Sequence, residues 1–157
     1  MGAPRRGPGG VFDLKYHLVW CPKYRRNLPQ TAQRALKLIL TSVCEARGWT
    51  IHAMEVMPDH VHLFLQTGVT DSPASVVQVL KGVSAKALFE NHAWLRMQWP
   101  KGHLWSPSYY IGTVGHVSEE TVKRYVETQK RRTVGRPRRD AAIPPPTEVG
   151  GSLAEES

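Results

Sequence analysis

The sequence predicts an α+β fold in which helices pack on one antiparallel sheet. Segments with strand alternation and segments with helical spacing follow one another in the order β-α-β-β-α-β, and a third helix comes after them. Hydrophobic residues make up 41% of the 157 residues, which suits an ordinary core. The cysteines, Cys21 and Cys44, form no Cys-x-x-Cys pair, which argues against a disulfide framework or a structural zinc site. One folded domain is therefore expected.

The first strand is predicted by apolar residues that alternate with other residues, namely Phe12, Leu14, Tyr16, Leu18 and Trp20. Pro22 closes this strand. The first helix, over about residues 31–47, is predicted by apolar residues at helical spacing: Leu36, Ile39, Leu40 and Val43. Gly48 suits the C-cap of that helix, because glycine adopts the left-handed conformation at low cost.

Two short β-rich runs, 49–57 and 60–66, flank the turn pair Pro58-Asp59 and predict a hairpin. Ser72 and Pro73 supply an N-cap and a first-turn proline for a second helix that reaches about Phe89.

The last part of the domain begins with a Trp-rich connector over 91–106, and residues 109–114 predict a fourth strand. Ser118, followed by Glu119 and Glu120, starts the third helix, since acidic side chains favour the positive end of a helix. This order matches the split βαβ, or ferredoxin-like, plan with a C-terminal helix added. Many unrelated functions use that plan, so function has to be argued from the site.

Both ends of the sequence are rich in Pro and Gly and poor in periodic apolar residues. We expect a disordered leader over 1–10, one folded domain over 11–133 and a disordered tail over 134–157, basic and then acidic. No run of 18 apolar residues and no signal peptide is present, which excludes membrane-spanning and secreted classes. The expected location is the cytoplasm.

The net charge of +8 is concentrated in one stretch. Residues 123–139 hold eight Lys or Arg and one Glu, a net charge of +7, whereas residues 140–157 carry −4. A polyanion such as nucleic acid is the expected partner of the basic stretch. The alternative is a solvated helix end with a basic tail.

His60 and His62 are the first candidate site residues. Strand alternation places both on one face and sends Val61, Leu63 and Leu65 to the other. Two imidazoles on one face can share a divalent cation. The alternative is a pair of half-buried strand histidines, and with seven histidines in the chain a chance His-x-His arises about 0.3 times.

Tyr125 and Gln129 are four residues apart on the last helix and face the same way. The alternative is a core tyrosine with a solvent-side glutamine, although this pair and a His-x-His arise together by chance in about one chain in twenty. A tyrosine that attacks a phosphodiester needs a nearby cation, because the free side chain has a pKa of about 10. Two imidazoles and a glutamine oxygen would suit Mg²⁺ or Mn²⁺. Asp59 is a candidate for orienting an imidazole, or else a plain turn residue after Pro58.

Four segments together resemble a known family: Tyr16–Arg26 (YHLVWCPKYRR), Met54–His62 (MEVMPDHVH), Leu104–Tyr109 (LWSPSY) and the Tyr125/Gln129 pair. They are similar to the single-tyrosine HUH transposases of the smallest bacterial insertion sequences, the IS200-like TnpA type. The similarity runs in order through residues 14–131, about three quarters of the chain. In that family the two histidines and the glutamine bind the metal and the tyrosine is the nucleophile, which the resemblance carries over to His60, His62, Gln129 and Tyr125.

The resemblance also implies the reaction and the partners. The expected reaction is cleavage and rejoining of single-stranded DNA at insertion-sequence ends through a 5′-phosphotyrosine. The expected partners are single-stranded DNA with hairpin ends and a second copy of the chain, whose tyrosine helix can complete the histidine pair of its partner. Candidate DNA contacts, each with a solvent-facing alternative, are Lys15, His17, Arg25, Arg26, Lys123, Arg124, Lys130, Arg131 and Arg132.

Two other classes of function share part of this residue pattern. A non-catalytic single-stranded nucleic-acid-binding protein could use the same sheet and basic helix, but it would not need the histidine, tyrosine and glutamine set. A two-histidine phosphoesterase or metal hydrolase is disfavoured, because no carboxylate stands at ligand spacing beside the single His-x-His.

Overall fold

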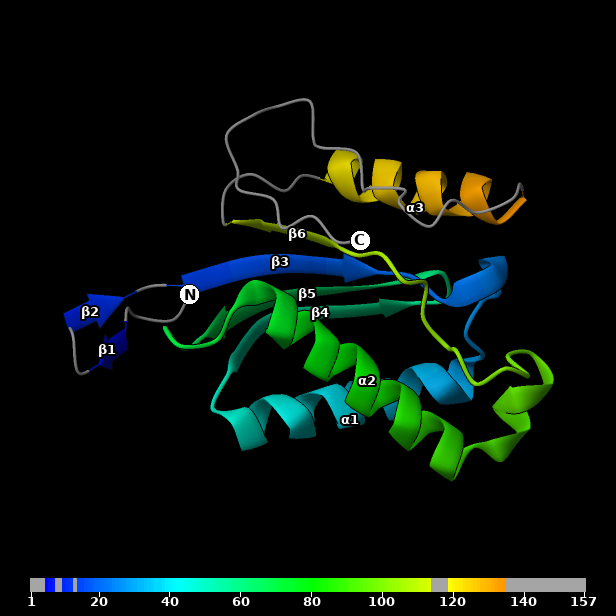
Figure 1. Ribbon diagram of the computed structural model, residues 1–157, viewed down its shortest axis with the longest axis horizontal. Coiled ribbons are helices and arrows are strands. Elements are labelled where there is room, and N and C mark those ends of the chain that lie inside the picture. The colour runs from blue at the N-terminus through cyan, green and yellow to red at the C-terminus, as the bar shows by residue number, and fades with distance from the viewer. Residues whose placement is uncertain (1–4, 8–9, 13, 114–118, 135–157) are drawn as a thin grey trace.

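A four-stranded antiparallel sheet forms the centre of the computed structural model, which describes residues 5–7, 10–12, 14–113 and 119–134 (Figure 1). The strands in chain order are β3 (Leu14–Trp20), β4 (Thr50–Met57), β5 (His60–Thr67) and β6 (Tyr110–Thr113). In space they are ordered β4-β5-β3-β6, and each neighbouring pair is antiparallel. β3 and β4 therefore run in the same direction with β5 between them, which is the split βαβ arrangement expected from the sequence.

Helices cover both faces of this sheet. α1 (Gln30–Arg47) and α2 (Pro73–Asn91) lie on one face, and α3 (Glu119–Val134) lies on the other (Figure 1). Gly48 ends α1 in the left-handed conformation with φ 74°, and the Ser72 side chain accepts a hydrogen bond from the Ser75 amide at the start of α2. The α+β fold class is confirmed.

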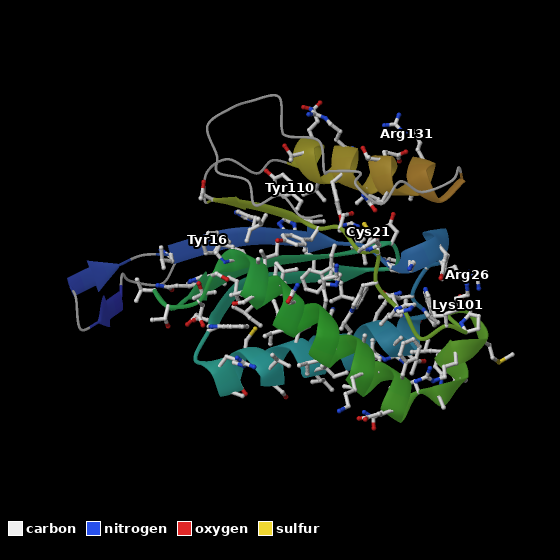
Figure 2. All side chains as sticks on the ribbon, viewed as in Figure 1. Tyr16, Cys21, Arg26, Lys101, Tyr110 and Arg131 are labelled. Atoms are coloured by element: carbon white, nitrogen blue, oxygen red, sulfur yellow. The ribbon has the colours of Figure 1, made fainter. Side chains whose placement is uncertain are left out.

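Strand alternation divides the buried side chains between the two faces. The face under α1 and α2 holds the larger core, which includes Leu18, Trp20, Val61, Leu63, Leu65 and Ile111 from the strands and Leu36, Leu40, Leu80 and Leu88 from the helices. The face under α3 holds a smaller cluster of six buried residues, which we call the α3 cluster: Val19, Cys21, Tyr110, Val122, Tyr125 and Val126. Figure 2 shows Tyr110 in this layer between β6 and α3.

Short elements complete the described chain. η1 (Lys23–Arg25) follows β3, and η2 (Ala93–Met97) lies in the connector between α2 and β6. Trp99 and Trp105 of that connector are buried in the larger core. Within the described residues, no helix is both long enough and apolar enough to cross a membrane.

The beginning of the chain differs from the sequence-based expectation. β1 (Arg5–Gly7) and β2 (Gly10–Phe12) form a two-stranded antiparallel ribbon, whereas disorder was predicted over 1–10. Backbone pairing needs no apolar core, and glycines at the paired positions 7 and 10 place no restriction on φ where the chain reverses. Residues 1–4 and 8–9 of the predicted leader lie outside the described residues. The predicted tail, 134–157, lies outside them too, except for Val134, which ends α3.

Candidate active site

The site begins with the two histidines of β5. Their neighbours Val61, Leu63 and Leu65 are buried in the larger core, so His60 and His62 project to the opposite face, toward α3. Both are half-buried. Their placement on one face follows the strand alternation read from the sequence.

Asp59 connects the first histidine to the last helix. Its carboxylate accepts a hydrogen bond from His60 Nδ1 at 2.9 Å and forms an ion pair with Lys130 Nζ at 3.1 Å. Burial acts to raise the pKa of Asp59, but the bonds from His60 and Lys130 outweigh it and lower the pKa below its usual value. The charged carboxylate holds Nδ1 of His60 as the protonated nitrogen, and this leaves Nε2 with its lone pair.

A third histidine lies beside the pair. His17 Nδ1 is 3.1 Å from His62 Nε2, and the His17 ring stacks on Phe64 with 4.6 Å between ring centroids. Burial and the nearby His62 lower the pKa of His17 to about 4. Burial also lowers the pKa of His62, against an opposing effect of Glu55, whose carboxylate is 3.7 Å from His62 Nδ1. Both rings are therefore neutral at pH 7, and a neutral His17 offers no charge to a phosphate.

Tyr125 comes from α3, in the layer that faces the histidines. It is only 2% exposed, and its hydroxyl donates a hydrogen bond to the Ser108 carbonyl at 3.1 Å. In the α3 cluster it packs with Val19, and Val19 is the cross-strand partner of His62. The tyrosine and the histidine pair thus share one face of the sheet. The hydroxyl of Tyr125 is therefore covered by its neighbours in this structure.

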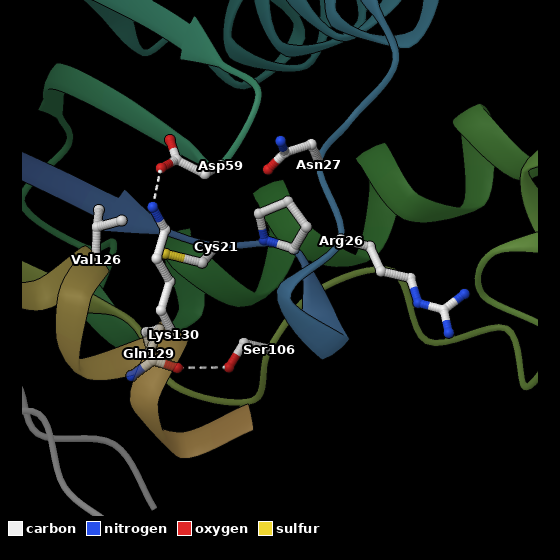
Figure 3. A pocket seen from close by; sticks show the side chains of 9 residues that line it. Cys21, Arg26, Asn27, Asp59, Ser106, Val126, Gln129 and Lys130 are labelled. Atoms are coloured by element: carbon white, nitrogen blue, oxygen red, sulfur yellow. Dashed lines mark hydrogen bonds and ion pairs between the residues drawn. The ribbon is translucent and has the colours of Figure 1, made fainter. Parts of the chain in front are cut away.

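Gln129 lies one helical turn after Tyr125 and is also buried. Its Oε1 accepts a hydrogen bond from Ser106 Oγ at 2.8 Å. Figure 3 shows it in a pocket between α3, the end of β3 and the β4–β5 turn. The lining residues are Cys21, Pro22, Arg26, Asn27, Asp59, Ser106, Val126, Gln129 and Lys130. Gln129 and Asp59 therefore meet in one pocket, although they are 70 positions apart in the sequence.

The thiol of Cys21 is a nucleophilic group that lines this pocket. Burial raises its pKa far above the ordinary value for a thiol, and the nearby Asp59 raises it further. A buried thiol with a raised pKa holds its proton and reacts poorly. Cys21 is thus a poor candidate for the group that attacks a substrate.

The predicted ligands are compatible with a divalent cation by their chemistry. His60 has Nε2 available, and Gln129 brings an amide oxygen, which accepts a hydrogen bond from Ser106 in this structure. The Nε2 of His62 faces His17, so that contact has to open before this nitrogen binds a metal. Among the described residues, no group of three or more His, Cys, Asp or Glu is arranged to hold a metal ion. Mixed nitrogen and oxygen ligands without thiolate suit Mg²⁺ or Mn²⁺.

The candidate DNA contacts are distributed over two elements and one turn. On α3, Lys123 and Arg131 are exposed, Arg124 is partly exposed, and Lys130 pairs with Asp59. After β3, Arg26 is exposed and donates to the Gln98 carbonyl. Lys15 is half-buried on β3, and the side chains of Arg25 and Arg132 lie outside the described part of the structure. Among the members of this set whose side chains are described, Arg26 and Lys130 line the pocket. DNA contact remains a prediction for all nine residues.

Sequence reasoning missed several members of the site. Ser106 and Ser108 hold Gln129 and Tyr125, and Glu55 lies near His62. The two serines lie within the segment Leu104–Tyr109 that the family resemblance had singled out, which was the one available signal for them. Glu55 lies within the segment Met54–His62 of the same resemblance, but nothing in that segment indicated its contact with His62.

Comparisons with known proteins agree on one family. A family profile described as "Transposase IS200 like" matches residues 10–129. The ISDra2 transposase TnpA of Deinococcus radiodurans is 39% identical over 126 residues, 80% of this chain and 90% of that protein. The transposase for insertion sequence element IS200 of Salmonella typhimurium is 32% identical over 123 residues, 76% of this chain and 81% of that protein. A crystal structure from Deinococcus radiodurans, titled as that of a transposase, superposes with a TM-score of 0.74 at 36% identity, covering 80% of this chain and 97% of that one.

Proposed function

The chain belongs to the IS200-like transposase family, which supports DNA transposition, and on that premise we propose that it cuts and rejoins single-stranded DNA with Tyr125 as the nucleophile. The observation that supports this most is the link from His60 through Asp59 to Lys130. It joins the strand of the histidine pair to the helix of the tyrosine, five residues beyond Tyr125.

The proposed reaction exchanges one phosphodiester for another. The Tyr125 hydroxyl loses its proton and its oxygen bonds to phosphorus, while the bond from phosphorus to the 3′ oxygen breaks. The leaving 3′ oxygen takes up a proton and becomes a 3′-hydroxyl, and the DNA keeps a 5′-phosphotyrosine link. In the rejoining step a 3′-hydroxyl attacks that phosphorus and releases the tyrosine. Bond types are conserved, so the reaction needs no nucleotide cofactor.

A divalent cation, Mg²⁺ or Mn²⁺, would be held by His60, His62 and Gln129, and when bound it would stabilise negative charge on the phosphate and on the phenolate. The residues around it have positioning roles. Asp59 fixes the proton of His60 on Nδ1, and Ser106 orients the amide of Gln129. The Ser108 carbonyl accepts the hydroxyl proton of Tyr125 in a hydrogen bond, and this bond has to break before attack.

The proposed substrate is single-stranded DNA with hairpin ends, bound by a homodimer. The exposed cations of α3, Lys123 and Arg131, support a polyanionic substrate on this face. In one chain Tyr125 already shares a sheet face with its own histidines, which supports assembly of the site within a subunit. An exchange of α3 between two subunits would bring the same side chains together, so both arrangements fit the proposal.

A single gel experiment tests the nucleophile. The protein is incubated with labelled single-stranded element ends and Mn²⁺, and the products are separated on a denaturing gel. Wild type is expected to give a covalent protein–DNA adduct, and Tyr125→Phe and a chelated sample to give none. An adduct that persists in Tyr125→Phe would contradict the assignment of Tyr125.

The same gel addresses the alternative of a non-catalytic single-stranded nucleic-acid-binding protein. One observation favours that alternative, since Tyr125 is only 2% exposed and its hydroxyl is already hydrogen-bonded. Tight binding of the element ends without any adduct in wild type would support the binder and contradict the transposase chemistry.

A further inference from the structure

The turn that follows β3, residues 22–27, contains a strained residue, and we call it the Tyr24 turn. Tyr24 has φ 66° and ψ 24°, and it is the one non-glycine residue with positive φ in the described chain. A bulky aromatic side chain rarely adopts this left-handed conformation, because its Cβ crowds the backbone. Strain of this kind persists where the surrounding structure enforces it, and it clusters at functional sites.

The surrounding structure does enforce the conformation. The Lys23 amide donates to the Leu104 carbonyl at 2.8 Å, and the Lys23 carbonyl accepts from Trp99 Nε1 at 3.0 Å. On the other side of Tyr24, the Leu28 amide donates to the Pro58 carbonyl at 2.8 Å. The turn is thus fixed by the connector before β6 and by the β4–β5 turn, while the Tyr24 side chain itself has no part in these bonds.

The Tyr24 ring lies at the surface, and two cations are close to it. It is 36% exposed, with Lys23 Nζ 5.3 Å and Arg26 Cζ 5.9 Å from the ring centroid. An exposed aromatic ring with flanking cations is the combination that proteins use for unpaired nucleotides, where the base stacks on the ring and the cations meet the phosphate.

The Tyr24 turn also borders the candidate active site. Pro22, Arg26 and Asn27 line the same pocket as Gln129 and Lys130. η1, which contains Tyr24, packs against α3, the helix of Tyr125. In Figure 2, Arg26 and Lys101 lie at the same end of the molecule, where β3 ends, so positive charge gathers there.

We propose that the Tyr24 turn binds one unpaired nucleotide of the strand that enters the active site. The base stacks on the Tyr24 ring, and Lys23 and Arg26 pair with its phosphate. This inference rests on the proposed action on single-stranded DNA and adds to it a site for a base next to the phosphate that is cut. Stacking accepts any base, so this site holds the strand in position without reading its sequence.

Two substitutions at Tyr24 test whether its ring contributes to the binding of single-stranded DNA. In a Tyr125→Phe background, in which no cutting is expected, a fluorescein-labelled single-stranded 20-mer is titrated and its anisotropy is measured. Tyr24→Phe keeps the ring and is expected to bind within twofold of the parent. Tyr24→Gly removes the ring and is expected to weaken binding by about 5- to 150-fold, the contribution of one stacked base.

Thermal unfolding provides the structural control. Glycine adopts the left-handed conformation freely, so Tyr24→Gly is expected to unfold at the same temperature as the parent or at a higher one. Loss of binding then cannot come from loss of the fold. Unchanged binding in Tyr24→Gly, or an equal loss in Tyr24→Phe, would overturn the stacking site.

Two further controls test the location and the ligand. Trp94 is 45% exposed and lies outside the pocket, so Trp94→Ala is expected to leave binding unchanged. A duplex of the same sequence keeps its bases stacked inside the helix, so its affinity is expected to be insensitive to Tyr24→Gly. An equal loss in Trp94→Ala or with duplex would show a general surface effect and refute the site.

The adduct assay with Tyr125 intact distinguishes this inference from the proposed function. If wild type forms no adduct while Tyr24→Gly still weakens single-strand binding, the cutting reaction is wrong and the nucleotide site stands. If wild type forms the adduct and Tyr24→Gly binds and reacts like wild type, the nucleotide site is wrong and the cutting reaction stands.

Discussion

The two faces of the sheet are covered in different ways. Under α1 and α2 the buried residues are almost all apolar, and the buried Ser84 hydroxyl accepts from Trp105 Nε1 and donates to the Lys81 carbonyl. Under α3 the six-residue cluster mixes valines with tyrosines and a cysteine, beside the buried polar side chains of Ser106 and Gln129. The larger core under α1 and α2 is expected to carry most of the stability, whereas the face under α3 holds the half-buried histidines and the hydrogen-bonded Tyr125. Stability and chemistry should therefore respond to different substitutions.

The largest effect is expected on the free energy of unfolding, when the adjacent β5 residues Leu63 and His62 are each replaced by alanine. Leu63 is fully buried under the helices, so Leu63→Ala is expected to lower the free energy of unfolding by about 2–5 kcal/mol, measured by urea denaturation. His62→Ala, on the other face, is expected to cost about 1 kcal/mol, the value of one hydrogen bond. Equal costs at the two positions would mean that the faces share one core.

Asp59 gives the next largest effect, on the α3 face. Asp59→Ala removes the partner of His60 Nδ1 and is expected to lower Mn²⁺ affinity by about 10- to 100-fold in isothermal titration calorimetry. Lys130→Met is the matched control, because it keeps the bond between Asp59 and His60 and should lower the affinity less. Equal losses of Mn²⁺ affinity in the two variants would assign the effect to the docking of α3. An unchanged Mn²⁺ affinity in both variants would show that Asp59 has no role in metal binding.

Amide hydrogen exchange in the wild-type protein compares the local stability of α3 with that of α1. α3 rests on a small mixed cluster, so its amides are expected to exchange at least about tenfold faster than those of α1 near Leu36 and Leu40. Val126→Ala should speed exchange in α3 and leave α1 unchanged. Similar protection in both helices would show that α3 opens only when the whole domain unfolds.

The smallest effect is expected on the outer side of α1. Leu38 is 72% exposed, so Leu38→Gln should change the free energy of unfolding by less than about 0.5 kcal/mol. A larger loss in urea denaturation would mean that Leu38 is covered in solution, for example by a second copy of the chain.

The sequence predicted most of the fold because its signals are local. Strand alternation correctly placed His60 and His62 on one face of the sheet. Ser72 caps the start of α2 and Gly48 caps the end of α1, as the sequence predicted. The ribbon of β1 and β2 was not predicted. Disorder was inferred from the lack of apolar residues to bury, and that criterion does not take account of hydrogen bonds between backbone segments.

The missed parts of the site depend on contacts between distant segments. The pairing of His17 with His62 follows from the register of β3 and β5, and the link from Asp59 to Lys130 follows from how α3 docks. Neither the register of two strands nor the docking of a helix can be predicted from the residues of one segment alone. The burial of Tyr125 against Ser108 has the same origin.

The topology of the sheet also sets an order of assembly. β4 and β5 are joined by a two-residue turn, whereas Val19 of β3 pairs with Tyr110 of β6, more than ninety positions later. Contacts between distant residues form late, because closing a long loop costs entropy before any bond compensates for it. α3 comes after every described strand in the chain, so on the ribosome the β4–β5 hairpin is synthesised before the helix that carries Tyr125. A growing chain therefore carries the histidine pair before the helix of Tyr125 and Gln129 exists, and the candidate site is complete only when the last helix has been made.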